Sequence, residues 1–331
     1  KSKGNVIAPQ KIFDTLGADI LRLWAASTDY SGELTISDEI LKRVVESYRR
    51  IRNTLRFLLA NIADFDPQKH TLPVEKWLEI DRYALALARS LQDAIAADYA
   101  RYEFHLIVQR LQTFCSEDMG GFYLDILKDR LYTAGENSAA RRSAQNALYH
   151  ITHSLVRLIA PILSFTAEEA WSVLCGKEDD SVFAGEWHEF PELKNKDPFS
   201  GWEQYGNLLE VWSSIRTIRN NVNKQLEEAR TAGLIGSALA AEVDVSVAGN
   251  DYEVLARLGD DLRFVFITSR ATVHRATAEA GQHIDVSASL HDKCERCWHY
   301  RADVGADTQY PTLCGRCVSN LSGSGEARKY A

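Results

Sequence analysis

The chain has 331 residues, of which 45% are hydrophobic and 25% are charged, and its formal net charge is −8. This length suits two or three domains with real cores, and no run approaches the roughly 18 consecutive apolar residues of a membrane helix, which argues against membrane insertion. The acidic balance argues against attraction of the whole molecule to nucleic acid, although one basic face can still meet a phosphate backbone. Six cysteines are too few for a secreted disulfide framework, so we expect a reducing cytoplasm.

Helical periodicity dominates the first half of the chain. Ser37, followed by two acidic residues, is typical of a helix start, and the long helix that it begins ends before Pro67. Thr166, with Glu169 three residues later, predicts a capping box at the start of a further helix. The other helices are predicted at about residues 17–28, 74–99, 103–117, 121–131 and 138–159. The pattern indicates an all-helical bundle.

The sequence pattern changes after the helical bundle. Between Cys175 and Trp202 the helical period gives way to Gly, Pro, Asp and isolated aromatic residues, which predicts a surface excursion at a domain edge. Another helix is predicted at about 208–232. After Gly236 the segments EVDVSVAG, LRFVFITS and HIDVSAS are rich in β-branched residues, so we predict strands in a small mixed α/β unit.

The strongest chemical signal is CERCWHYRADVGADTQYPTLCGRC, in which sixteen residues separate two CxxC pairs. Two such pairs at tight turns can supply four soft ligands in the tetrahedral arrangement that Zn²⁺ accepts. A closed set of four protein ligands favours a structural ion, which would stabilise a tail too small to bury a core. Redox dithiols, disulfides, or iron in place of zinc are the alternatives. The predicted ligands of one zinc ion are Cys294, Cys297, Cys314 and Cys317.

Basic and aromatic side chains surround the cysteine pairs, and such side chains could stack on unpaired bases and touch phosphates. The alternative is that Trp298 and Tyr300 simply pack within the zinc-binding tail. The residues predicted to contact RNA here are Lys293, Arg296, Trp298, His299, Arg301 and Arg316.

The long second helix carries a line of cations. Lys42, Arg49 and Arg56 are spaced by seven residues, which places them on one face, opposite the apolar one. From Lys42 to Arg56 there are six cations and one acid, a local charge of +5 in an acidic chain. We call this set the basic stripe; its remaining members are Arg43, Arg50 and Arg52. The stripe favours a phosphate-binding face, and the alternative is an ordinary solvated helix surface.

The opening KSKGNV and the following GADILRLWAASTDYSGE resemble the region after the KMSKS signature loop of class I aminoacyl-tRNA synthetases, with the first three residues of that loop missing. The similarity continues through SDEILKRVVESYRRIRNTLRFLLAN, VQRLQTFCSEDMGGFYLDILKDRLYT and LIAPILSFTAEEAW to CERCWHY and LCGRCVSNL. Leucyl and valyl relatives share the early helices. A four-cysteine zinc unit after a small α/β segment resembles the bacterial isoleucyl-tRNA synthetases in particular.

The resemblance implies a mainly α fold in a carboxyl-terminal fragment that begins inside the KMSKS loop. The expected parts are a loop remnant with its connection at 1–30, a helical-bundle anticodon-binding domain at 31–200, a helix plus small α/β junction unit at 201–290, and a zinc-binding tail at 291–331. Lys1 and Ser2 would contact ATP only in the intact parent, where the lysine meets developing charge.

The implied function is the anticodon-side, tRNA-binding portion of a ligase that joins isoleucine to its tRNA using ATP. We expect isoleucine tRNA as partner, no DNA, and a cytoplasmic monomer. The fragment holds no HIGH-type signature and no editing sequence, so no catalytic residue is expected in it and it should not itself be an enzyme. The alternative is an independent zinc-ribbon scaffold for protein partners. A hydrolase or transferase is set aside, because His105, His150 and His153 lack a recognisable partner motif.

Overall fold

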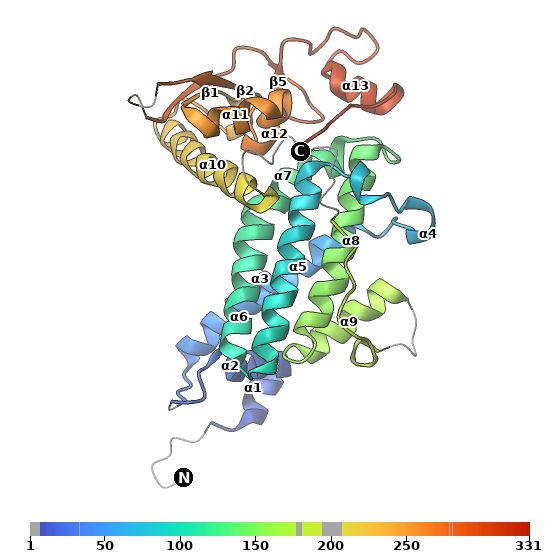
Figure 1. Cartoon of the computed structure of the whole chain (residues 1–331), viewed down its shortest axis with the longest axis vertical. Helices are drawn as coiled ribbons and strands as arrows, with labels where there is room; N and C mark the ends of the chain where they lie inside the picture. The colour runs from blue at the N-terminus through green and yellow to red at the C-terminus, as the bar shows by residue number, and fades with distance from the viewer. Residues whose placement is uncertain (1–6, 33, 177–180, 194–206, 278, 280) are drawn as a thin grey trace. The chain divides into compact units, whose positions relative to one another are not determined.

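The computed structural model describes residues 7–32, 34–176, 181–193, 207–277, 279 and 281–331 (Figure 1). The chain forms two compact units, each assembled from several segments. The helical unit comprises the described parts of Lys1–Pro67, Leu85–Phe122 and Gln145–Pro191. The zinc unit comprises the described parts of Gln68–Ala84, Tyr123–Ala144 and Glu192–Ala331. The predicted fold class, mainly α with a small α/β part and a four-cysteine tail, is confirmed.

The longer helices follow the predicted order. They are α1 (Pro9–Leu16), α2 (Ala18–Ser27), α3 (Asp38–Asn61), α4 (Pro67–His70), α5 (Glu79–Ala100), α6 (Phe104–Thr113), a π-helical turn (Phe114–Tyr123), α7 (Leu124–Thr133), α8 (Ala139–Ile159), α9 (Ser164–Cys175), α10 (Leu208–Thr231), α11 (Gly249–Leu258), α12 (Leu262–Phe266) and α13 (Gly315–Ser322). Short 3₁₀ turns lie at Val74–Lys76, Val182–Ala184, Ala238–Ala240 and Gly259–Asp261. Within the described residues, no helix combines the length and the apolar character that crossing a bilayer would require.

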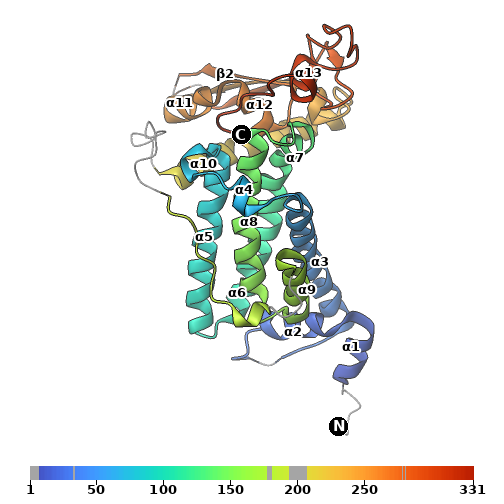
Figure 2. The ribbon, with the colours of Figure 1, turned by 90° about the vertical axis from the view of Figure 1, so that its right-hand side faces the viewer.

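In the helical unit, α3 begins as its sequence predicts. The Ser37 hydroxyl accepts a hydrogen bond from the backbone N–H of Ile40, which satisfies one of the free donors at the helix start. The apolar row then faces the core, with Ile51, Leu55 and Leu58 at most 2% exposed. Helices α6 and α9 pack against α3, and Figure 2 shows α9 alongside it.

The predicted capping box at Thr166 is wrong. Helix α9 begins two residues earlier, at Ser164, so Thr166 lies inside its first turn. The Asp19 carboxylate, from α2, takes the capping role, because it accepts hydrogen bonds from the backbone N–H of Thr166 at 2.8 Å and from its hydroxyl at 2.6 Å. Glu169 instead accepts two hydrogen bonds from Arg52 of α3. A cap supplied from a distant helix leaves no local pattern.

The zinc unit contains a three-stranded sheet in the order β2–β1–β3, formed by β1 (Ala241–Val247), β2 (Arg270–Arg275) and β3 (His283–Ala288). Strand β1 runs parallel to β2, with Val245 beside Val273, and antiparallel to β3. A second, two-stranded ladder joins β4 (Asp292–Lys293) to β5 (Tyr300–Arg301). The sheet and the helices α11 and α12 make up the predicted α/β part.

The segment LRFVFITS, predicted as a strand, forms α12 instead. All five residues of α12 are buried, so the helix shows no amphipathic period, and a short apolar run of this kind cannot be told from a buried strand. Ile267 ends α12 in the left-handed region, at a φ of 58°. The strand of this region, β2, lies just beyond, in the sequence RATVHR.

Candidate zinc centre and nucleic-acid interface

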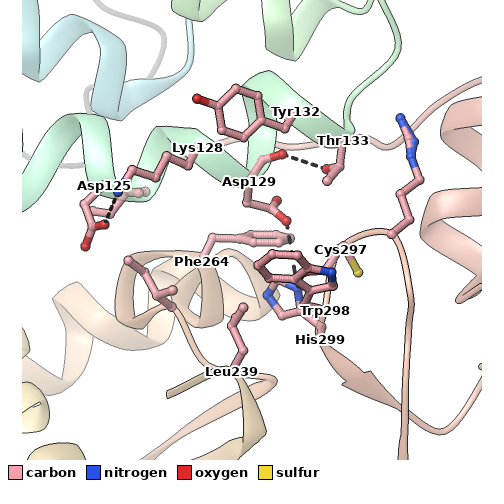
Figure 3. A pocket seen from close by; sticks show the side chains of 13 residues that line it. Asp125, Lys128, Asp129, Tyr132, Thr133, Leu239, Phe264, Cys297, Trp298 and His299 are labelled. Atoms are coloured by element: carbon pink, nitrogen blue, oxygen red, sulfur yellow. Dashed lines mark hydrogen bonds and ion pairs between the residues drawn. The ribbon is translucent and has the colours of Figure 1, made fainter. Parts of the chain in front are cut away.

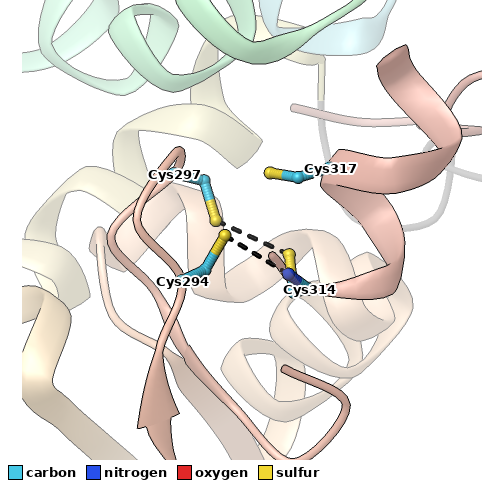
Figure 4. Close-up of side chains that lie close together, drawn as sticks. All are labelled: Cys294, Cys297, Cys314 and Cys317. Carbon is cyan, nitrogen blue, oxygen red and sulfur yellow. Dashed lines mark hydrogen bonds between the residues drawn. The ribbon is translucent and has the colours of Figure 1, made fainter. Parts of the chain in front are cut away.

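The four predicted zinc ligands meet at one point in the zinc unit (Figure 4). Their sulfur atoms all lie within 4.8 Å of one another, and each cysteine is at most 7% exposed. The Sγ atoms of Cys297 and Cys314 are 3.7 Å apart. A tetrahedral zinc ion with Zn–S bonds of about 2.3 Å would hold its sulfurs about 3.8 Å apart. That separation is far longer than the roughly 2 Å of a disulfide, so the geometry suits an ion rather than a covalent bridge.

Each cysteine pair sits on a tight turn. In the first turn, the backbone N–H of Trp298 donates to the carbonyl oxygen of Cys294 at 2.9 Å. The second turn leads into α13, and there the Asp303 carboxylate accepts from the backbone N–H of Gly315 at 2.9 Å. A Cβ at Gly315 would lie only 2.8 Å from the same carboxylate, so a side chain at this position would push Asp303 away from the backbone N–H that it accepts from.

Three of the four thiols alter one another's pKa values. Hydrogen bonds from Cys314 and Cys317 lower the pKa of Cys297, while the hydrogen bond to Cys297 raises the pKa of Cys314 to about 11. Ionisation of one cysteine therefore makes ionisation of its neighbour less favourable. A divalent cation would remove this competition because it stabilises every thiolate that it binds. The donor set therefore fits zinc as a structural ion.

The side chains predicted to touch RNA near the cysteines divide into two groups. Trp298 is 59% exposed and Lys293 lies over its ring, with the ammonium 5.3 Å from the ring centroid. Arg296 is half-buried, and Arg301 donates to the carbonyl oxygen of Ser269 at 3.2 Å. Lys293, Arg296, Trp298 and Arg301 therefore keep at least part of their surface available to a ligand.

Two of the residues predicted to contact RNA, Arg316 and His299, lie largely buried inside the zinc unit. The Arg316 side chain is 11% exposed and makes two hydrogen bonds, of 2.7 and 2.8 Å, to the Asp129 carboxylate. His299 is 2% exposed. Neither side chain forms part of an outward basic surface, because burial of Arg316 requires a partner and Asp129 supplies it.

Asp129 is a structural centre that the sequence did not reveal. Besides Arg316, it pairs with Arg328, whose side chain is 1% exposed. Burial raises the pKa of Asp129, but the two guanidinium groups outweigh this effect and hold its pKa well below the ordinary value. The ring of Phe264 lies against the same cations, with the Arg328 guanidinium carbon 3.6 Å from the ring centroid. These partners are remote in sequence, and no local signal links them.

The basic stripe of α3 keeps most of its charge at the surface. Lys42, Arg50 and Arg56 are exposed, and the structure records no ion pair for them among the residues it describes. Arg49 pairs with Glu46 at 2.7 Å, and both side chains remain more than 60% exposed.

Arg43 and Arg52 differ from the rest of the stripe. Arg43 pairs with Glu39 at 2.5 Å in an exposed pair. Arg52 makes two hydrogen bonds to Glu169, of 2.8 and 2.9 Å, and a third to the Tyr48 hydroxyl. Arg52 thus joins α3 to α9, a structural role that the sequence did not predict.

A cluster of three histidines lies in the helical unit. His150 Nδ1 is 2.9 Å from His188 Nε2, and the rings of His153 and His188 stack with their centroids 5.5 Å apart. Burial lowers the pKa of His150 and His153 to about 4 and that of His188 to about 3. Among the described His, Cys, Asp and Glu side chains, the four cysteines alone form a group with metal-ligand spacing. These three histidines therefore act as neutral packing groups. Lys1 and Ser2 lie outside the described residues.

Comparison with known protein families supports both parts of the site. Residues 81–234 match the family model of the anticodon-binding domain of tRNA ligases. Residues 292–320 match the zinc finger found in FPG and IleRS, and residues 1–37 match the class I tRNA synthetases of the I, L, M and V group. A solved LeuRS–tRNA–LeuAMS complex of Agrobacterium radiobacter K84 is similar at 16% identity, over 75% of this chain and 24% of that chain, with a TM-score of 0.43.

Curated relatives are similar along the whole chain. The isoleucine–tRNA ligase of Dechloromonas aromatica is 64% identical over 99% of this chain and 34% of its own length. That of Nitrosomonas europaea is 62% identical over 100% of this chain and 35% of its own length. The chain spans about a third of the length of these relatives. Along its whole length, the chain is thus a homologue of part of the isoleucine–tRNA ligases, and it carries the anticodon-binding domain and the zinc finger of that family.

Proposed function

We propose that this chain is the carboxyl-terminal, anticodon-side part of an isoleucine–tRNA ligase, and that it binds isoleucine tRNA. The observation that carries the proposal is the similarity of about 60% identity that spans the whole chain and includes an anticodon-binding domain. The parent would join isoleucine to its tRNA with ATP. The fragment binds RNA and does no chemistry itself. It works in the cytoplasm as a monomer.

The RNA-binding surface of this proposal has two parts. Exposed cations of α3 hold phosphates: Lys42, Arg49, Arg50 and Arg56. Side chains beside the cysteine turns contact bases and phosphates: Lys293, Arg296, Trp298 and Arg301. Phosphate contacts position the RNA and base contacts select it, so the first set should act on every tRNA and the second should discriminate.

One zinc ion, held by Cys294, Cys297, Cys314 and Cys317, supports the second set of contacts. The ion would fix the two turns and hence the direction of Trp298. Its chemistry is structural, since four protein ligands leave no open position for a substrate. We also propose domain boundaries near residues 30, 200 and 290. In the intact parent, Lys1 and Ser2 would contact ATP.

The test is a titration of the whole, zinc-loaded chain with isoleucine tRNA and with an unrelated tRNA, at two salt concentrations. We expect binding that weakens steeply with salt, because released counterions drive phosphate binding, and a preference for isoleucine tRNA. Absence of tRNA binding at low salt would contradict the proposal and favour the zinc-ribbon scaffold, whose apolar interfaces depend little on salt.

A further inference from the structure

Residues 325–331 form no helix or strand, yet they are held closely within the zinc unit. We call this segment the strap. The Arg328 side chain is 1% exposed, and Tyr330 and Ala331 are 7% and 1% exposed. Ordering such an irregular segment costs conformational entropy, so a small number of specific contacts must hold it in place.

The first end of the strap is attached to the second cysteine turn. Arg316 lies in this turn, between Cys314 and Cys317. Its guanidinium donates to the Glu326 carboxylate of the strap at 3.3 Å. The Asn320 amide of α13 also donates to that carboxylate, at 3.1 Å, and its carbonyl oxygen accepts from the backbone N–H of Glu326 at 2.8 Å. The turn that would hold the ion therefore also holds the strap.

Asp129 of α7 connects the same turn to the middle of the strap. It lines a pocket of about 390 Å³ shared by α7 and the first cysteine turn, where Figure 3 shows it directed toward Phe264. Its carboxylate accepts from Arg316 at 2.7 and 2.8 Å and also pairs with Arg328. Arg328 donates to Glu326 as well, at 2.7 Å. Two carboxylates and two guanidinium groups thus balance one another, and loss of one cation would leave buried negative charge without its partner.

The other end of the strap reaches the start of α5. The backbone N–H groups of Lys329 and Tyr330 donate to the Asp261 carboxylate at 3.0 and 2.7 Å. The backbone N–H of Ile80 then donates to the carbonyl oxygen of Tyr330 at 2.9 Å. Ile80 lies in the first turn of α5, where N–H groups have no partner within the helix, and it is 1% exposed. Release of the strap would therefore leave a buried donor unsatisfied.

We propose that the zinc ion and the strap are thermodynamically coupled. The strap docks more tightly on the start of α5 when the ion holds the second cysteine turn, and the docked strap strengthens the hold on the ion. The groups that connect the two sites are Arg316, Asp129, Glu326 and Arg328. Such a coupling is reciprocal, because each event changes the equilibrium constant of the other by the same factor. Zinc occupancy thereby controls the order of a segment that contains none of the ion's ligands. The inference goes beyond the proposed function and does not depend on RNA binding.

The experiment uses the whole chain, either loaded with zinc or stripped of it, and two variants. Arg328→Gln removes the cation of the strap and leaves every cysteine in place. Arg219→Gln is the matched control, because Arg219 is a 4% exposed side chain of the zinc unit that pairs with Asp125, also on α7, outside the connecting groups. Competition with a chelator of known affinity gives the dissociation constant of zinc. Hydrogen–deuterium exchange measured by mass spectrometry follows the peptides that contain Ile80 and Tyr330.

Coupling between two sites typically changes an affinity by about 5- to 150-fold, so Arg328→Gln should raise the dissociation constant of zinc by a factor in this range. Removal of zinc from the parent should speed exchange in the Ile80 and Tyr330 peptides by a similar factor. In Arg328→Gln the two peptides should exchange rapidly even with zinc bound, and removal of the ion should add little. Arg219→Gln should bind zinc as the parent does.

Three results would overturn the inference. If removal of zinc leaves exchange in both parent peptides unchanged, the strap docks independently of the ion; this comparison needs no variant and decides even where Arg328→Gln does not fold. If Arg328→Gln frees the strap but binds zinc as tightly as the parent, the connecting groups transmit nothing. If Arg219→Gln weakens zinc binding as much as Arg328→Gln, the effect reflects general loosening of the zinc unit.

Discussion

The side chains of the basic stripe differ in how much each can contribute to the free energy of RNA binding. A cation already paired in a fixed geometry, such as Arg52 with Glu169, gains little from a phosphate because it must first leave its partner. An exposed pair such as Arg49 with Glu46 is weak in water, typically below about 1 kcal/mol, and yields easily. Sequence alone shows the charges but not this difference, since Glu169 is 117 residues away from Arg52.

Replacing Arg49 or Arg56 with Ala should weaken binding of cognate and unrelated tRNA by similar factors. Each lost phosphate contact should lower the slope of log affinity against log salt by roughly 0.7–0.9. Stability should change by less than about 0.5 kcal/mol, because both side chains are exposed. Filter-binding titrations across a salt series measure the effect.

A matched control for Arg49 is Arg230→Ala. Arg230 pairs with Glu227 three residues away on α10, at an exposure of 57% that resembles the 65% of Arg49. Its removal should leave tRNA affinity and the salt slope unchanged. Equal behaviour of Arg49→Ala, Arg56→Ala and the parent would make the stripe an inert solvated surface.

The histidine cluster should make the helical unit sensitive to acid. Burial depresses the pKa of His150 and His153 from 6.5 to about 4. Between these pH values the unfolded chain therefore binds more protons than the folded chain. Stability is therefore full above about pH 6.5 and falls as the pH drops towards 4. We expect the free energy of unfolding to decline across this window by up to about 3 kcal/mol for each of the two histidines. Urea melts at a series of pH values measure it.

The variant His153→Gln tests the cause. His153 Nδ1 accepts from Arg157 at 3.0 Å, and a glutamine can accept without titrating. We expect a shallower dependence of stability on pH than in the parent. His291→Gln, at an exposed position of the zinc unit, should leave the dependence unaltered. A parent whose stability is flat between pH 7 and 4 would show that the cluster is not buried in solution.

At the scale of elements, the sequence predicted best where one local rule decides the structure. The row of apolar residues and the Ser37 cap located α3, and the cysteine spacing located the metal site. Prediction failed where tertiary context decides: α12 is buried on every side, and α9 takes its cap from Asp19 of another helix. The pocket at the cysteine turn was equally out of reach, because α7 and the turn are more than 160 residues apart in sequence.

Leu55 shows what the apolar row of α3 contributes. It is 2% exposed and next to the exposed Arg56 in sequence. Truncation to Ala removes buried methyl groups and leaves a cavity, so Leu55→Ala should lower the free energy of unfolding by about 2–5 kcal/mol. The affinity of the remaining folded protein for tRNA should not change. Urea unfolding measures the first quantity, and a loss below about 1 kcal/mol would contradict the packing of this row.

The start of α10 offers a milder test of a local rule. Asn207 accepts from the backbone N–H of Glu210, and the Glu210 carboxylate accepts from the backbone N–H of Asn207, both at 3.1 Å. This is a complete capping box, although only the helix itself was predicted. Asn207→Ala should cost about 1 kcal/mol and Asn207→Ser much less. Thermal melts of the two variants that coincide with the parent would show that the cap is not formed.

Across the whole molecule, each unit has its own source of stability. The helical unit has a large apolar core, whereas the cysteine turns bury little more than their four sulfurs together with Val304 and Leu313. Such a small cluster cannot offset the conformational entropy of the chain around it, so the ion must supply the difference. The ion pairs of Asp129 with Arg316 and Arg328 attach these turns and the last residues to α7 within the zinc unit.

Elemental analysis of protein purified without chelator should find one zinc per chain, and Cys297→Ser should abolish it. We expect the turns around Cys294 and Cys314 to exchange their amide hydrogens rapidly in this variant, because three ligands bind zinc far more weakly than four. The helical unit should keep its cooperative melt, since its core lies elsewhere in the chain. Cys175→Ser, which alters a half-buried cysteine of the helical unit, is the matched control and should retain the metal. If Cys297→Ser retained zinc, another ligand set would be required. If it lost the helicity of the helical unit, the ion would stabilise far more of the molecule than the zinc unit that contains it.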